Sequence, residues 1–291
     1  MNGPVEAVLV IPAARPDNPL GRMRDRQKAP MPAPNPNKVA AASPRQNRKE
    51  LRLHSSIARD LGLRIVSGRY RPGHVLAGEI EASGQLKVSR SAYREAVRML
   101  AAKGLVQSRT RTGTRVSAVE QWHLLDPDVL TWVFAGEPEL EVLQGLFELR
   151  TIIEPEAAAL AAARRNEKNV EVMRNALARM ALHTVNVEAG RIADKEFHSE
   201  LLRATRNPFI ISLTNGVAAA VHALTEFKQR AQALKRDPLP EHWRVFHAIE
   251  AKDTVEARAA MTELIRLAIT DMPVKRWPEN WTDSRLVQDS G

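Results

Sequence analysis

The sequence of 291 residues contains no cysteine. Disulfide bonds, thiolate metal sites and a cysteine nucleophile are therefore excluded, and a reducing cytoplasm is the expected compartment. The sequence also lacks any run of about 18 apolar residues, so we predict no membrane-spanning helix and no membrane partner. The opening stretch AVLVIPAA is short and follows no basic residues. It is a poor match to a secretory signal peptide.

Aromatic residues are scarce, and residues 1–48 contain none, although they hold 9 of the 18 prolines. Such a segment cannot bury enough apolar surface to offset the entropy lost on ordering. We therefore predict a disordered, Pro-rich tail over residues 1–48. Residues 1–50 carry nine basic against four acidic residues, so the tail is either a non-specific DNA-contacting arm or dispensable.

Positive charge is concentrated in one part of the remaining chain. Residues 51–118 carry 13 Lys and Arg against four Asp and Glu, whereas residues 119–291 carry 21 against 26. A basic module joined to a mildly acidic one suggests a polyanion-binding domain attached to a domain with another task.

The pattern within residues 49–118 predicts a winged helix-turn-helix. Apolar residues recur every four positions from Glu50 to Ile65, which indicates a helix. A short helix is expected over residues 79–86. Ser89 is suited to cap a third helix that ends near Gly104, and residues 105–116 alternate around a turn as in a hairpin.

The rest of the chain predicts an all-α domain. Helices are expected over residues 139–163, 167–183, 188–205, 208–231, 240–251 and 254–271, and no alternating strand pattern occurs among them. We therefore expect a mainly α protein: an N-terminal winged helix over 49–118, a linker over 119–138, a helical-bundle effector domain over 139–272 and a tail over 273–291. The linker contains Trp122 and Trp132 and is the expected hinge.

Several motifs resemble one family in combination, over roughly residues 50 to 272. Val88-Ser89-Arg90, Arg94-Glu95-Ala96, Gly104-Leu105 and Gly113-Thr114 resemble the winged helix of GntR-type transcriptional regulators. Glu148-Leu149-Arg150, Glu154-Pro155, Asp194, Phe197-His198 and Glu241-His242 are similar to the effector domain of the fatty-acid-regulator (FCD) branch. The segment from Gln121 to Val133 resembles the linker of galactonate operon repressors. One departure is Ile80, because an Arg often occupies that position and contacts DNA in some relatives.

The start of the third helix holds the candidate DNA-binding residues. A helix in the major groove needs base-reading side chains near its N-terminus and hydroxyls or amides that contact phosphate. Ser89, Arg90, Ser91 and Arg94 are positioned for this, with Thr110, Arg111 and Gly113 at the wing. The simpler interpretation is a solvated face in which Arg94 and Arg98 accompany Glu95. The expected macromolecular partner is a double-stranded DNA operator.

The candidate effector-binding residues are Arg150, Asp194, His198 and His242. Asp194 and His198 are four residues apart on one helix face, and with His242 they suit a divalent metal such as zinc. The resemblance implies one Asp and three His as ligands, but the third His position is Leu264. A metal could keep the three ligands with water or effector, His222 or His247 could substitute, or the site could be metal-free.

The cation for an acidic effector is expected to be Arg150, whose fork suits a carboxylate. The alternative is a buried ion pair with Glu154.

These features favour a homodimeric repressor of a sugar-acid, galactonate-like catabolic operon, or a relative that responds to another small carboxylate. A helical metal-dependent hydrolase is the alternative of another class. It is disfavoured because no serine elbow, P-loop or nucleotide fingerprint is present, and we predict no enzymatic activity. An architectural nucleic-acid binder would leave the helical domain unexplained.

Overall fold

The computed structural model describes residues 44–109, 112–231, 236–274 and 277. Residues 1–43 of the predicted tail lie outside the described residues. The last five residues of the predicted tail are helical, because α1 runs over Pro44–Val66 and begins six residues before the predicted start at Glu50. Proline is favoured in the first turn of a helix, where its missing N–H has no partner to lose. Most of the tail predicted over 273–291 also lies outside the described residues.

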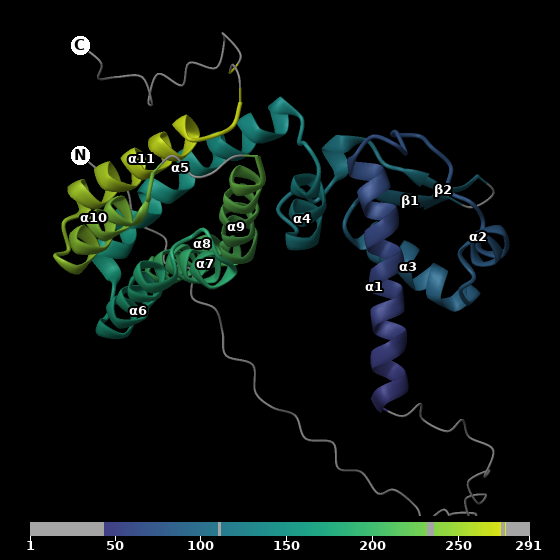
Figure 1. The fold of residues 1–291 in the computed structure, drawn as a ribbon, viewed down its shortest axis with the longest axis horizontal. Helices are drawn as coiled ribbons and strands as arrows, with labels where there is room; N and C mark the ends of the chain where they lie inside the picture. Colours follow the sequence, from purple (N-terminus) through teal and green to yellow (C-terminus); the bar gives the residue numbers. More distant parts are fainter. Residues whose placement is uncertain (1–43, 110–111, 232–235, 275–276, 278–291) are drawn as a thin grey trace, which may run out of the picture. The chain divides into compact units, whose positions relative to one another are not determined.

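The winged helix has the predicted elements. After α1 come α2 (Glu79–Leu86), α3 (Arg90–Ala102) and an antiparallel hairpin of β1 (Val106–Arg109) and β2 (Gly113–Val116), in which Val106 pairs with Val116. These elements enclose a core that includes Ile65, Leu100 and Leu105. The prediction of a winged helix is confirmed (Figure 1).

Two residues fix the ends of α3. The Ser89 side chain accepts a hydrogen bond from the Ala92 backbone N–H at 3.1 Å, which satisfies one of the free amides of the first turn. Gly104 follows the helix at φ +73°, and a Cβ there would lie 2.0 Å from the Gln121 carbonyl oxygen. Only glycine fits at this position, so the chain turns sharply from α3 into β1.

The linker contains a helix that the sequence reading did not identify. A 3-10 turn over Val119–Gln121 is followed by α4 (Pro127–Ala135), whose first turn is capped by Asp126. Trp132 of α4 packs with the winged-helix core, whereas Phe134 packs with the core of the helical domain. The segment is therefore a structured connection between two cores.

The helical domain consists of α5 (Leu140–Arg164), α6 (Glu167–His183), α7 (Glu188–Ala204), α8 (Pro208–Ser212), α9 (Thr214–Ala231), α10 (Leu239–Glu250) and α11 (Thr254–Thr270). In Figure 1, α5, α10 and α11 lie side by side, and the direct packing of α11 on both α5 and α10 agrees with this view. Fully buried alanines of α5, such as Ala158 and Ala162, let neighbouring helices approach closely. None of the helices within the described residues is long and apolar enough to cross a bilayer.

One predicted helix is wrong: residues 208–231 form two helices. The Ser212 hydroxyl donates to the Phe209 carbonyl at 2.6 Å, and the Leu213 N–H donates to Ile210 rather than to Phe209. The bond of Leu213 to the residue three positions back tightens the last turn of α8, which ends at Ser212. The other five predicted helices of this domain agree with the structure to within one residue at either end.

Candidate effector pocket and DNA-binding face

A small polar cavity of about 40 Å³ lies in the helical domain. All four predicted effector-binding residues line it, although they come from α5, α7 and α10. Its further lining residues are Val185, Val221, Thr225, Lys228, Arg236, Pro238, Leu264, Ala268 and Asp271. A concave site with convergent polar groups is typical of small-ligand binding.

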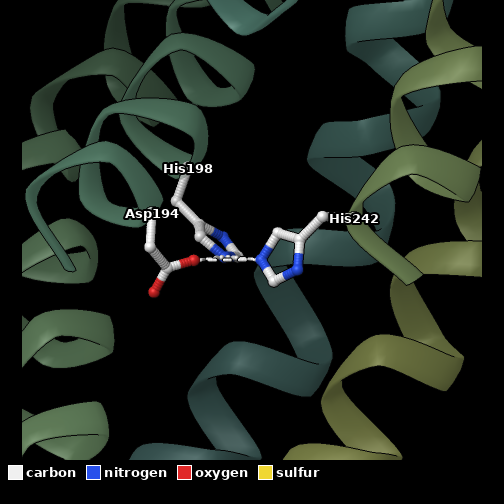
Figure 2. Close-up of side chains that lie close together, drawn as sticks. All are labelled: Asp194, His198 and His242. Atoms are coloured by element: carbon white, nitrogen blue, oxygen red, sulfur yellow. Dashed lines mark hydrogen bonds and ion pairs between the residues drawn. The ribbon is translucent and has the colours of Figure 1, made fainter. Parts of the chain in front are cut away.

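Asp194, His198 and His242 form a buried cluster in this cavity. Figure 2 shows the first two projecting from α7 toward His242 on α10. Asp194 Oδ1 lies 3.0 Å from His242 Nε2 and 3.6 Å from His198 Nε2, and the two Nε2 atoms are 3.4 Å apart. In the part of the chain that the structure describes, no other Asp, Glu or His group meets the spacing expected of metal ligands.

The Nδ1 atom of each imidazole faces an oxygen that accepts a hydrogen bond and cannot donate one. His242 Nδ1 lies 2.7 Å from the Pro238 carbonyl, and His198 Nδ1 lies 2.9 Å from the Glu154 carboxylate. Each Nδ1 therefore carries the proton, and in the neutral rings both Nε2 lone pairs face Asp194. Lone pairs this close repel one another unless a cation lies between them. Either protons or a metal ion can supply that charge.

The donor set fits a divalent metal. A tetrahedral site with metal–nitrogen distances of about 2.1 Å has ligand atoms roughly 3.4 Å apart, and the three donor atoms are separated by 3.0–3.6 Å. The oxygen and imidazole donors suit zinc and similar ions. The hydrogen-bond acceptors beside each Nδ1 are of the kind that orient histidine rings toward a bound metal.

Electrostatics keep both buried carboxylates ionised. Burial alone would raise the pKa of Asp194, but the hydrogen bond and charge of His242, with the charges of His198 and Arg150, lower it to about 2. For Glu154, burial also acts to raise the pKa, and the charges of Arg150 and His198 outweigh it and lower the pKa to about 2. The cavity therefore presents anionic oxygens to a cation at neutral pH.

Arg150 is already paired. Its Nε lies 2.5 Å from Glu154 Oε1, and Glu154 in turn contacts His198, so the three side chains form a buried row. The sequence left two alternatives for Arg150: a guanidinium that binds the effector carboxylate, or a buried ion pair with Glu154. The structure has the ion pair. Arg150 lines the cavity, but its charge is compensated within the protein.

The structure places the other histidines away from the cluster. His222 faces Glu188 at 3.8 Å, and His247 is largely exposed and stacks on Trp243. Neither lines the cavity, so neither replaces the third histidine ligand. Leu264 does line it, so the cavity has an apolar side chain at the sequence position where the resemblance implies a third histidine.

Three charged pocket residues were missed from the sequence: Lys228, Arg236 and Asp271. Arg236 pairs with Glu241 at 2.9 Å and with Asp271 at 2.8 Å. A signal existed for Lys228, because it continues the apolar stripe of α9 through Val217, Val221 and Leu224. A lysine on a buried helix face is uncommon enough to mark a functional position.

The candidate DNA-binding residues lie at the exposed N-terminal end of α3. Arg90 is exposed and forms no ion pair or hydrogen bond with other described residues. Arg94 lies 3.9 Å from Glu79, with both side chains about half exposed, and Arg98 pairs with Glu95 at 2.7 Å. Exposed pairs of this kind are worth less than about 1 kcal/mol, so a phosphate or a base edge can displace Glu79 from Arg94.

The two serines and the wing complete this face. The Ser89 and Ser91 hydroxyls lie 3.0 Å apart at the helix start. Gly113 begins β2 at φ +78°, a conformation that favours glycine. Thr110 and Arg111 lie outside the described residues.

Comparison with known proteins matches both domains. Residues 53–116 match the description "Bacterial regulatory proteins, gntR family", and residues 145–267 match the FCD domain. The chain is 33% identical over 212 residues to the HTH-type transcriptional regulator YieP of Escherichia coli K12. The aligned region covers 72% of this chain and 91% of YieP. The chain belongs to the GntR family of transcriptional regulators, with an FCD effector domain.

A second relative of this GntR regulator is a named operon repressor. The chain is 31% identical over 206 residues to the galactonate operon transcriptional repressor of Escherichia coli K12, covering 70% of this chain and 90% of that protein. Among solved structures, Lar of Listeria monocytogenes superposes with a TM-score of 0.53 at 18% identity, over 75% of this chain and 95% of that one, which supports the fold.

Family membership decides between the function classes. The matched families and the named relatives are DNA-binding regulators, so the GntR regulator is not an enzyme and the hydrolase alternative is rejected. The pocket agrees with this result. The carboxylates near the cluster that could act as a general base are engaged: Glu154 with Arg150, Glu196 with Arg179, and Glu200 with Asn169.

Proposed function

We propose that this GntR regulator is a homodimeric repressor of a sugar-acid catabolic operon, and that a small carboxylate in the helical domain releases it from its operator. The observation that carries the proposal is the buried cluster of Asp194, His198 and His242 within a polar cavity. The similarity to a galactonate operon repressor supports a sugar acid as the effector class.

The cluster would hold a divalent ion through three side chains, and water or an effector oxygen would take the position beside Leu264. When bound, the ion supplies a Lewis-acid contact for an effector oxygen. The protein's own part is to hold the donors in place: Glu154 and the Pro238 carbonyl fix the two imidazole rings.

The DNA-binding role falls to α3. Arg90 would read a base edge, because its guanidinium has no partner within the described part of the chain and lies at the helix start. Arg94 would also contact a base edge once DNA displaces Glu79 from it. The DNA phosphates would be contacted by the two serines and the wing: Ser89, Ser91, Thr110, Arg111 and Gly113. A homodimer would place two such helices on the half-sites of a two-fold operator in the bacterial cytoplasm.

A contiguous set of contacts would carry the effector signal. Next to Lys228 on α9, Phe227 packs edge-on against Phe134 of α4 at 6.0 Å, and Arg230 donates to the Ala135 carbonyl. At the other end of α4, Lys103 after α3 binds Asp126 at 2.7 Å and Asp128 at 2.8 Å. A shift of α9 would therefore reach α3 through α4. The effector must bind the DNA-competent and DNA-released states with different affinity.

The test is operator release. Binding of the purified protein to its own promoter region is measured by fluorescence anisotropy at fixed salt, while D-galactonate, D-gluconate or neutral galactitol is added. We expect release by an aldonate, none by galactitol, and no release for Asp194→Ala. Glu171→Ala, which removes an exposed carboxylate from α6, is the matched control. Tight operator binding that no aldonate disturbs would contradict the sugar-acid assignment.

A further inference from the structure

Among the described residues, Lys228 is the cation of the cavity for which no partner is found. Arg150 is paired with Glu154, and Arg236 with Glu241 and Asp271. No hydrogen bond or ion pair joins Lys228 to another residue in the described part of the chain. The two carboxylates that line the cavity are engaged elsewhere, Asp194 with His242 and Asp271 with Arg236.

The helix that carries Lys228 directs it toward the cavity. Val221, Thr225 and Lys228 occupy one face of α9, at intervals of four and three residues, and all three line the cavity. The Thr225 hydroxyl donates to the Val221 carbonyl at 2.9 Å, so its oxygen is left as an acceptor. The wall around Lys228 therefore combines one uncompensated cation with a polar neighbour.

We propose that Lys228 binds the carboxylate of the effector, the role that the sequence assigned to Arg150. This inference rests on the proposed function and names the residue of that site that recognises the acid. A partly buried ammonium without an anion is costly, and a ligand carboxylate supplies the missing charge and a charge-assisted hydrogen bond. The cluster of Asp194, His198 and His242 then contacts another oxygen of the same ligand.

The environment of Lys228 agrees with this role. Burial, followed by the charge of Arg150, lowers the pKa of Lys228 to about 8, against the weaker opposing effects of Asp271 and Asp194. The lysine is still mainly protonated at neutral pH. The protonated Lys228 side chain is therefore available to bind an anion in the cavity.

The proposal is tested by calorimetric titration of the full chain at fixed salt and pH 7. The probes are D-galactonate, D-gluconate, L-lactate, inorganic phosphate and neutral galactitol. They are added to the wild type, Lys228→Met, Lys228→Arg and Lys168→Met. Lys168 is exposed on α6, so its replacement removes the same charge away from the cavity. Circular dichroism establishes that each variant is folded.

We expect Lys228→Met to weaken binding of the acid about 10- to 100-fold, which corresponds to the loss of one hydrogen bond to a charged group. Lys228→Arg should recover most of the loss because it restores the charge, and Lys168→Met should bind as the wild type does. Equal affinity of the wild type and Lys228→Met would overturn the proposal, as would an arginine variant no better than methionine. Binding of phosphate in preference to every carboxylate would also overturn it.

The outcomes separate this inference from the proposed function. If an acid binds through Lys228 but does not release the operator, Lys228 keeps its role and the repressor model is wrong. If an aldonate releases the operator equally from the wild type and Lys228→Met, the repressor model stands and the role of Lys228 is wrong. If none of the acids binds the wild type, both are wrong.

Discussion

Replacing Lys228 with methionine should stabilise the protein while it weakens the effector response. A pKa lowered from 10.5 to about 8 means that the folded state disfavours the ammonium by about 3 kcal/mol, at 1.36 kcal/mol per pKa unit. Methionine has a similar length and no charge, so this penalty disappears. At pH 7 we expect a gain of about 2–3 kcal/mol in the free energy of unfolding, or roughly 4–10 °C in Tm.

The gain should depend on pH in a defined direction. Below about pH 8 the lysine is protonated in both states, and the wild type bears the full penalty. As the pH rises from about 8 to 10.5, the folded state has lost its proton while the unfolded state keeps it. The wild type therefore gains stability over this range. The advantage of Lys228→Met should be largest below pH 8 and vanish near pH 10.5.

The assay is differential scanning fluorimetry of the ligand-free protein at pH 7, 9 and 10.5, supported by chemical denaturation. Lys168→Met is the control, and an exposed substitution of this kind should change stability by less than about 0.5 kcal/mol. A Lys228→Met variant no more stable than the wild type at pH 7 would refute the argument, because the buried charge would then carry no cost. A gain that persists unchanged at pH 10.5 would refute its electrostatic origin.

Three further predictions concern the other parts of the molecule. Arg90→Ala should weaken binding to the operator about 10- to 100-fold in fluorescence anisotropy but leave scrambled DNA little affected; an equal loss on both would indicate a phosphate contact. Asp194→Ala should reduce zinc affinity at least about 10-fold by calorimetry, and unchanged affinity would reject the three-residue site. Lys103→Met should leave Asp126 and Asp128 without their shared cation and lower the unfolding free energy by about 1–3 kcal/mol in chemical denaturation, whereas an unchanged value would mean that this pairing does not hold α4.

Much of the fold could be predicted because it depends on local pattern. Ser89 caps α3 through a contact three residues away, Gly104 ends it through its own backbone conformation, and five helices of the effector domain follow their apolar periodicity. The helix expected over residues 208–231 is divided at Leu213, whose N–H donates to Ile210 three residues back, a local change that periodicity does not reveal. The helix α4 was missed, although Asp126 followed by Pro127 is a recognisable helix start.

The sequence by itself determined the class of this protein: a basic winged helix joined to a helical domain, with Asp194 and His198 on one helix face. The family resemblance had already added His242 to this pair. Only the tertiary structure decided that His222 and His247 lie away from the cluster, that Arg150 is compensated by Glu154, and that Lys228 is the cavity cation without a partner among the described residues. Helix periodicity shows which face of a helix is buried. The pairing of charged side chains depends on how helices that are far apart in the chain pack together, and that packing cannot be read from the local pattern of one sequence.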